Sequence, residues 1–146
     1  MSYRGKYTVK DTSKYLGDPK KVRFLSMWEY SLMKYLDACP SVVKWNSEDV
    51  IIDYICGTDG QQHKYMIDFY IILDSGKKLL IEVKPYRQTQ EPKGKKRRTK
   101  AYLNECLVYI KNTSKWAAAK KFAELNGAEF QIWTENELRL LGIRIL

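Results

Sequence analysis

The residues best suited to chemistry are two acids and a lysine, Asp68, Glu82 and Lys84. They lie in two apolar runs, residues 66–73 and 79–84, whose β-branched and aromatic side chains predict adjacent strands. Two carboxylates that face each other repel unless a cation lies between them, and hard oxygen ligands suit Mg²⁺ or Mn²⁺. A lysine beside such an ion can orient water or phosphate as a cation, or act as a base after losing its proton.

The turn between the two runs decides whether these side chains meet. Asp74-Ser75-Gly76 suits a type I turn closed by a bulge, with Gly76 in the left-handed conformation. In that register Asp68 lies directly opposite Glu82, and Lys84 emerges on the same side of the sheet. A two-residue loop would instead send Asp68 to the other face. The alternative without a site is that Asp68 and Lys84 pair across the strands while Glu82 is solvated at an edge.

A helix before the hairpin carries a further acid. Residues 23–36 predict an amphipathic helix in which Leu25, Glu29, Leu32 and Leu36 share one stripe. Glu29 would then point toward the core, where a metal or a basic site would supply the partner that it needs. The alternative is that Glu29 reaches solvent from the edge of the stripe.

The remaining pattern predicts an α/β fold with a central mixed sheet of about four strands, in the order α-β-β-β-α-β. A capping box at Thr134-Glu135-Asn136-Glu137 opens a short last helix that Gly142 ends. The other expected elements are a strand near residues 50–55, helices at 101–111 and 114–126 with Thr113 or Ser114 as the cap between them, a helix terminator at Gly127, and a strand at 128–133.

The segment 65–69, taken with Ile81-Glu82-Val83-Lys84, resembles the PD-(D/E)xK nuclease superfamily, whose signature is an Asp, a hairpin and then acid-any-Lys. Ile67 stands where that motif has its proline. The order of elements is that of the superfamily core, and the superfamily often places an acid on the first helix. The opening and the tail are similar to phage head-completion nucleases and to the endonuclease subunit of heteromeric transposases, on the segments 2–7, 14–19, 116–119 and 133–135.

The resemblance implies a restriction-endonuclease-like core and a metal-dependent DNA endonuclease. Asp68, Glu82 and the backbone carbonyl of Val83 would hold one or two Mg²⁺ ions, for which Mn²⁺ substitutes. Glu29 would complete the site directly or through water, and Lys84 would position the attacking water. The expected role is the processing of the packaged DNA end before tail attachment, beside portal or neck proteins, in the host cytoplasm during assembly or in the virion. The alternatives are a non-cutting virion protein that binds DNA ends and a dimeric junction resolvase.

The net charge of +9 indicates a polyanionic partner. The expected DNA-binding side chains lie in one basic run and are Lys93, Lys95, Lys96, Arg97, Arg98 and Lys100. A solvated loop is the alternative for this run. Residues 1–18 form a basic arm in which Tyr3, Tyr7 and Tyr15 either stack on unpaired bases or pack against the domain.

Composition predicts one ordinary domain over residues 1–146, since 45% of 146 residues are hydrophobic. No apolar stretch reaches the length of a membrane span, and the polar start is not that of a signal peptide. Cys39, Cys56 and Cys106 lack metal-ligand spacing and are expected to be buried thiols in a reducing cytosol. His63, the single histidine, is expected to be an ordinary surface residue.

The basic run yields a testable prediction. If Lys95, Lys96, Arg97 and Arg98 neutralise phosphates, changing all four to Ala should flatten the salt dependence of DNA binding. Each lost contact should reduce the slope of log affinity against log salt by about 0.7 to 0.9 units, depending on strandedness. Titrations of labelled DNA at several salt concentrations measure this slope, and an unchanged slope would show that the run is not the DNA surface.

Overall fold

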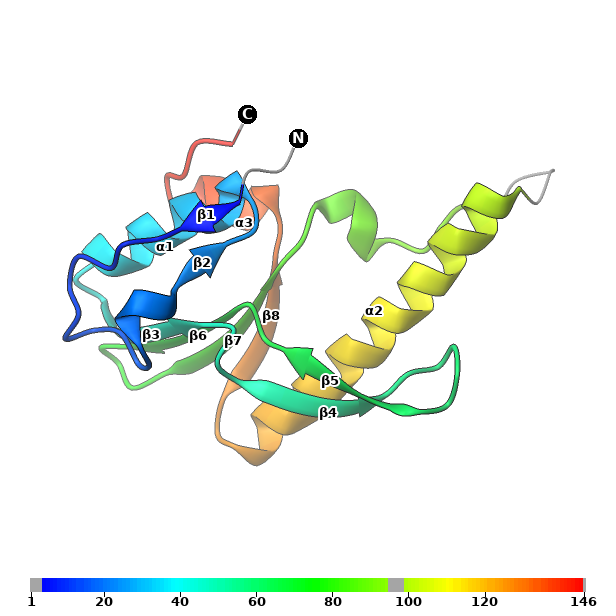
Figure 1. The fold of residues 1–146 in the computed structure, drawn as a ribbon, viewed down its shortest axis with the longest axis horizontal. Coiled ribbons are helices and arrows are strands. Elements are labelled where there is room, and N and C mark those ends of the chain that lie inside the picture. Colours follow the sequence, from blue (N-terminus) through cyan, green and yellow to red (C-terminus); the bar gives the residue numbers. More distant parts are fainter. Residues whose placement is uncertain (1–3, 95–98, 146) are drawn as a thin grey trace.

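The computed structural model describes residues 4–94 and 99–145 (Figure 1). Its elements in chain order are β1 (Gly5–Lys6), the 3₁₀ helix η1 (Pro19–Lys21), β2 (Arg23–Phe24), α1 (Met27–Ala38), β3 (Val42–Ser47), β4 (Ile51–Ile55), β5 (Gln62–Met66), β6 (Phe69–Leu73), β7 (Lys78–Val83), the 3₁₀ helix η2 (Tyr86–Thr89), α2 (Lys100–Leu125), β8 (Glu129–Trp133) and α3 (Glu135–Leu140). Within these described ranges no helix is both long enough and apolar enough to cross a membrane.

A mixed four-stranded sheet in the order β3-β6-β7-β8 forms the centre of the fold. The β3–β6 and β6–β7 pairs are antiparallel, whereas β8 returns parallel to β7 after α2 crosses over. Such a parallel return needs a long connection, which the helix provides. The predicted α/β fold with a mixed sheet of about four strands is therefore confirmed.

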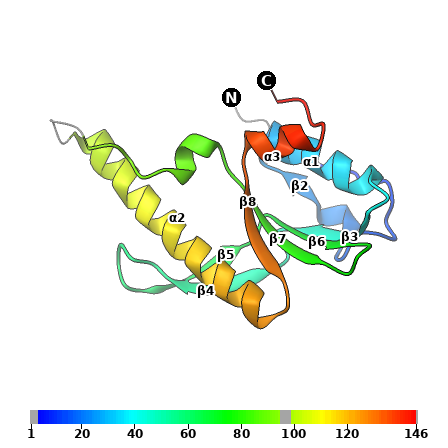
Figure 2. The ribbon, with the colours of Figure 1, turned by 180° about the vertical axis from the view of Figure 1, so that it is seen from behind.

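The sheet is buried on both faces, because its alternate side chains enter two separate cores. Phe69, Ile71 and Ile81 face a core that also contains Leu32 and Leu36 from α1 and further side chains from α3 and residues 7–22. Leu80 faces the other core, which is built from α2 and the β4–β5 ribbon. The two groups of elements lie on opposite sides of the sheet in both views (Figures 1 and 2).

The hairpin turn has the predicted geometry. Gly76 has a φ of 87°, and its N–H donates to the Leu73 carbonyl at 2.9 Å. Leu73 in turn pairs with Lys77 through an N–H to carbonyl bond of 2.9 Å, so the register that follows is the one the turn predicts. A left-handed glycine is what a three-residue loop of this kind requires.

The run 66–73 is not the single strand that the sequence predicts. It divides at Ile67 and Asp68 into β5, which pairs with β4, and β6, which pairs with β3 and β7. The predicted strand near 50–55 is therefore real as β4, but it belongs to a separate ribbon. The unpredicted β3 is the strand that takes the edge of the central sheet.

Two helix predictions also need correction. Residues Arg23–Phe24 form β2 against β1, and α1 starts after Ser26, whose hydroxyl accepts from the Glu29 N–H at 3.2 Å. Leu25 consequently lies outside the helix and is 43% exposed. The two helices expected after the hairpin are one continuous helix, α2, because Thr113 and Ser114 donate their hydroxyls back to carbonyls of the preceding turn instead of starting a new helix.

The end of the chain follows the prediction closely. Gly127 and Gly142 both have positive φ and end α2 and α3, respectively. At the start of α3 the Thr134 side chain and the Glu137 side chain form the expected capping box. Between α2 and α3, β8 forms at the position of the predicted strand.

The amino-terminal segment packs against the domain as far as it is described. Tyr7 and Tyr15 are buried, and the Tyr7 hydroxyl donates to Asp37 at 2.7 Å. The same carboxylate accepts the backbone N–H groups of Lys10 and Asp11. Tyr7 and Tyr15 are therefore structural and are not available to stack on bases, while Tyr3 lies outside the described residues.

The Asp37 contacts predict how this segment is held. Burial raises the pKa of Asp37, but three donors and the Lys14 charge outweigh burial and lower it. A depressed pKa stabilises the fold above the unfolded value of about 3.9 and ceases to do so as pH falls through the folded value. Asp37→Asn should cost about 2 kcal/mol at pH 7 in urea unfolding, with a smaller loss in Tyr7→Phe, and the cost should shrink in acid. Equal stability of Asp37→Asn and wild type at pH 7 would contradict this account.

Candidate active site

Strand pairing places three carboxylates in a row across the central sheet. Ser47 pairs with Phe69 and Phe69 pairs with Ile81, so one further step puts Glu48 beside Asp68 and Asp68 beside Glu82. The Glu48 N–H donates to the Asp68 carbonyl at 3.2 Å, which confirms the first of these neighbours. The predicted register of Asp68 opposite Glu82 is thus the observed one.

Asp68 lies at the bend where the chain leaves the β4–β5 ribbon and enters β6. Its Oδ2 accepts the Val83 N–H at 2.8 Å, which fixes the carboxyl group against β7. Burial raises the pKa of Asp68 well above its ordinary value, and the neighbouring Glu82 and Glu29 charges act in the same direction. The Val83 N–H and the Lys84 ammonium oppose that shift without cancelling it.

Glu29 comes from the first turn of α1 and is only 8% exposed. Its carboxylate accepts the Ser26 hydroxyl at 3.2 Å. Burial raises the pKa of Glu29, and the Glu48 and Glu82 charges add to the effect. Glu29 therefore points inward as the helical stripe predicts, and the alternative of an acid that reaches solvent is wrong.

Carboxylate oxygens of Glu29, Glu48 and Asp68 all lie within 4.8 Å of one another. Burial also raises the pKa of Glu48. Three acids this close, one of them buried and two partly buried, favour a bound cation because an ion would relieve both their repulsion and their desolvation. Hard oxygen donors of this kind suit a divalent ion such as Mg²⁺, Mn²⁺ or Ca²⁺.

Glu82 is buried next to this group, with 6% of its surface exposed. Its Oε2 accepts a short hydrogen bond from the Tyr65 hydroxyl, and its Oε1 lies 3.7 Å from the Lys84 ammonium. The alternative in which Asp68 pairs with Lys84 while Glu82 is solvated is therefore wrong. Tyr65 and Lys84 hold Glu82 in place beside Asp68.

Glu48 is a site residue that sequence reasoning missed, because β3 itself was not predicted. Its φ is 55°, and it is the one residue other than glycine with a positive φ in the ranges 4–94 and 99–145. A left-handed glutamate carries backbone strain of about 1–3 kcal/mol, and such residues cluster at functional sites. The signal available in the sequence was the acidic pair Glu48-Asp49 soon after Val42, Val43 and Trp45, which are residue types that favour strands.

Lys115 on α2 is a second missed residue. Its ammonium lies 5.3 Å from the centre of the Tyr65 ring, and Tyr65 is the donor to Glu82. Burial lowers the pKa of Lys115, as do the Lys111 and Lys84 charges, whereas Glu82 and Asp68 oppose the shift. Two lysines, Lys84 and Lys115, therefore face the acids from β7 and from α2.

The predicted basic run is only partly within the described ranges. Lys93 and Lys100 are exposed, and Lys100 begins α2. Lys95, Lys96, Arg97 and Arg98 lie outside the described residues, so their assignment to DNA stays a prediction.

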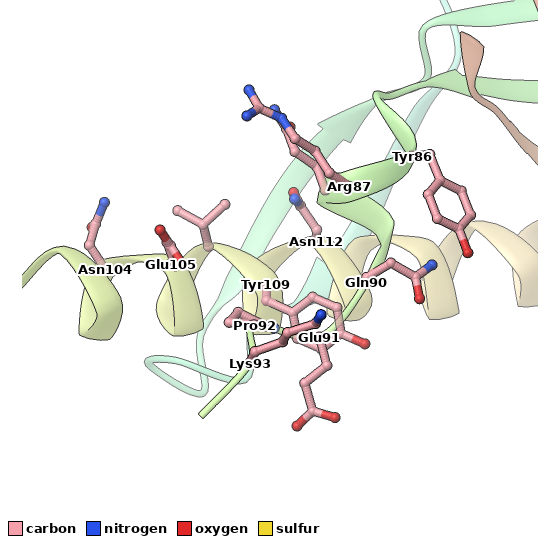
Figure 3. A pocket seen from close by; sticks show the side chains of 12 residues that line it. Tyr86, Arg87, Gln90, Glu91, Pro92, Lys93, Asn104, Glu105, Tyr109 and Asn112 are labelled. Atoms are coloured by element: carbon pink, nitrogen blue, oxygen red, sulfur yellow. The ribbon is translucent and has the colours of Figure 1, made fainter. Parts of the chain in front are cut away.

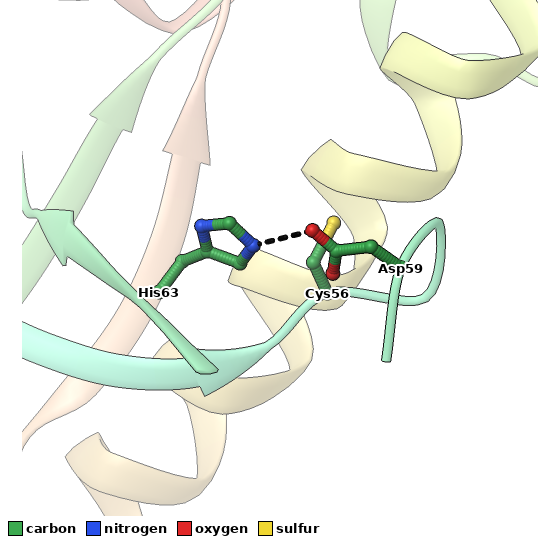
Figure 4. A group of neighbouring side chains, drawn as sticks. All are labelled: Cys56, Asp59 and His63. Carbon is green, nitrogen blue, oxygen red and sulfur yellow. Dashed lines mark hydrogen bonds and ion pairs between the residues drawn. The ribbon is translucent and has the colours of Figure 1, made fainter. Parts of the chain in front are cut away.

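A second group of potential ligands lies on the β4–β5 ribbon (Figure 4). Ligand atoms of Cys56, Asp59 and His63 lie within 4.8 Å of one another, although their sequence spacing gave no metal signal. His63 is exposed as predicted, and its Nε2 lies 2.8 Å from Asp59. Cys56 is buried, whereas Cys39 and Cys106 are only partly so, which corrects the expectation of three buried thiols.

Crowding of the acids predicts a stability effect. In metal-free protein at neutral pH, Asp68→Asn should raise the melting temperature by about 3–6 °C, since it removes one of the repelling charges. Because the folded pKa is raised, this advantage should disappear as pH falls below the unfolded value of about 3.9. Mg²⁺ should stabilise wild type more than Asp68→Asn. Thermal melts with chelator or Mg²⁺ test this, with the exposed acid variant Asp53→Asn as the matched control.

Comparison with known proteins agrees with this geometry. Residues 39–135 match the family described as TnsA-like endonuclease N terminal. Over 99% of both chains the protein is also 39% identical to the head completion nuclease of Enterobacteria phage T4. The matched range contains Glu48, Asp68, Glu82 and Lys115, so the acidic row and both lysines lie within the endonuclease region. The family match covers more than half of the sequence, and the chain therefore belongs to the TnsA-like endonucleases.

Proposed function

We propose that this endonuclease hydrolyses DNA phosphodiester bonds with Mg²⁺, for which Mn²⁺ substitutes, at the acids around Asp68. The observation that carries the proposal is the convergence of Glu29, Glu48 and Asp68 oxygens within 4.8 Å, beside the buried Glu82. When bound there, a divalent ion would lower the pKa of a water, polarise the phosphodiester and stabilise the leaving oxygen.

The acids divide into two kinds by their present partners. One Asp68 oxygen accepts the Val83 N–H, which orients the carboxyl group and leaves its other oxygen for the ion. Glu29 and Glu48 reach the same point from α1 and from the end of β3. Tyr65 and Lys84 hold Glu82, so its contact with the ion would require an exchange of these partners when the ion binds. We also propose the Val83 carbonyl as a ligand of the ion.

The two lysines supply the positive charge that a phosphodiester needs. Lys84 is held 3.7 Å from Glu82, where it orients a water for attack or takes its proton. Lys115 lies on α2 with its ammonium over the Tyr65 ring, where it would contact the phosphate. Neutralisation of the phosphate lets it enter a site that is otherwise lined by carboxylates.

In biological terms, we place this activity in phage head completion, as the name of the T4 relative suggests. The enzyme would trim the end of packaged DNA before the tail attaches, next to portal or neck proteins and in the host cytoplasm or the virion. A non-cutting protein that binds DNA ends would need the basic surface but not the acids. Four crowded carboxylates with raised pKa values at three of them cost stability, which favours the catalytic role.

Cleavage by variants tests the proposal. Asp68→Ala, Glu82→Ala and Lys84→Ala should each abolish nicking of plasmid DNA in Mg²⁺, and Glu48→Ala should be as severe because it removes a ligand of the same group. The DNA affinity of the Glu48, Asp68 and Glu82 variants should stay within about threefold of wild type, because binding rests on basic residues rather than on these acids.

The matched control is Asp53→Ala, which removes an exposed acid from the β4–β5 ribbon and should leave cleavage unchanged. Chelator should stop wild-type cleavage, and added Mg²⁺ or Mn²⁺ should restore it. Full nicking by Asp68→Ala protein free of host nucleases would refute the assignment of the site. Wild-type nicking with unchanged metal dependence in Glu48→Ala would remove Glu48 alone from the site.

A further inference from the structure

A pocket of about 720 Å³ lies between α2 and the segment 86–93 (Figure 3). Tyr86 and Arg87 line it from the segment, and Tyr109 and Asn112 line it from the helix. This volume is within the usual range for small-molecule sites. None of the residues proposed above for catalysis lines it.

Both walls of the pocket belong to segments that also carry residues of the candidate active site. Tyr86 follows Lys84 by two residues, and Asn112 precedes Lys115 by three residues on α2, or about 4.5 Å of helix rise. A DNA strand whose phosphate lies between Lys84 and Lys115 would therefore bring a neighbouring nucleotide to the pocket.

Asn112 is the unusual lining residue, because most of its side chain is buried while its amide makes no hydrogen bond to another described residue. It is 7% exposed, and no hydrogen bond joins its side chain to any other residue in the ranges 4–94 and 99–145. The buried side-chain polar atoms without a partner in the described residues belong to Trp45, Asn46 and Trp116, so the Asn112 amide keeps contact with solvent in the pocket. An amide that faces the pocket and has no protein partner can bind a ligand with polar edges. In Figure 3 the Asn112 side chain rises from α2 toward the segment that carries Arg87.

The other lining groups narrow the class of ligand. Tyr86 and Tyr109 offer aromatic faces, and Pro92 and Val108 add apolar surface. Arg87 and Lys93 are balanced by Glu91 and Glu105, so these four side chains carry no net positive charge. The two carboxylates would repel a run of phosphates inside the pocket. A flat, uncharged ring with hydrogen-bonding edges fits all of these groups, since tyrosines stack on bases and an asparagine amide can both donate and accept.

We propose that this pocket binds one unpaired nucleobase of the DNA substrate, stacked against Tyr86 or Tyr109 and hydrogen-bonded by Asn112. The proposal rests on the endonuclease site described above and adds a substrate preference to it. DNA with a single-stranded extension or a frayed end presents such a base, whereas an intact duplex does not. The pocket thus gives the enzyme a preference for DNA structure that needs no reading of a long sequence.

Binding to DNA with a missing base tests the proposal without requiring cleavage. The probe is a labelled duplex with a single-stranded extension in which an abasic residue is moved one position at a time, titrated in chelator. At one position near the junction, loss of the base should weaken wild-type binding by about 5- to 150-fold, the range for one stacked base. Equal affinity at every abasic position would overturn the proposal.

Two variants assign that effect to the pocket. Tyr86→Ala changes a side chain that is 51% exposed, and the backbone N–H that Tyr86 donates to Glu135 is unaffected. It should remove the difference between intact and abasic DNA, whereas Leu107→Ala should not, since Leu107 is 52% exposed on α2 and does not line the pocket. The same loss in both variants would overturn the proposal.

Asn112→Leu separates a ligand role from a structural one. Leucine removes an amide that makes no hydrogen bond to another described residue, and it has the higher helix propensity, so the melting temperature should stay equal or rise. The preference for intact over abasic DNA should nevertheless fall. A lower melting temperature with the preference retained would show that Asn112 is structural. Because these readouts do not involve cleavage, absence of a base preference in the wild type with normal Asp68-dependent nicking would refute the pocket alone. A base preference together with nicking that does not depend on Asp68 would refute the active site alone.

Discussion

The pairing of three strands around Asp68 is the constraint on which the rest of the site depends. Backbone hydrogen bonds fix β3, β6 and β7 in one register, and that register places Glu48, Asp68 and Glu82 side by side. Their repulsion is not relieved by distance, since each is held at the end of a strand or inside one. Burial raises the pKa values of Glu29, Glu48 and Asp68, and the charges of neighbouring carboxylates add to the rise at Glu29 and Asp68.

The surrounding structure tolerates this crowding because the acids lie at the junction of two rigid cores. One core holds α1, which brings Glu29, and the other holds the β4–β5 ribbon, which brings Tyr65 to Glu82. Neither core would lose apolar packing if the acids were neutral amides. We therefore attribute the charged groups to the proposed chemistry rather than to folding, and the positive φ of Glu48 supports the same proposal.

The helix α2 links catalysis to substrate choice. Its carboxy-terminal half packs on the sheet through Ala119 and Ala123, whereas its amino-terminal half extends past the sheet beside the η2 segment (Figure 1). Lys115 lies between these halves, next to the site, and Asn112 lies one turn earlier in the pocket. One rigid element thus sets the distance between the phosphate that is cut and the base that we propose is bound. A helix is well suited to this, since its rise per residue is fixed.

Local rules in the sequence determined the features that depend on neighbours along the chain. The Asp74-Ser75-Gly76 turn fixed the hairpin register, and with it Asp68 opposite Glu82 and Lys84 beside them. Helical spacing turned Glu29 inward, and Gly127, Gly142 and the Thr134 capping box marked helix ends.

Only the tertiary structure decided what depends on distant pairing. It split residues 66–73 between two sheets, fused the helices of 101–126, buried Tyr7 and Tyr15, and brought Glu48 and Lys115 to Asp68. Those outcomes follow from which strand or core a segment meets, and the energy of that choice comes from packing and ladder bonds between residues far apart in sequence, which no local pattern records.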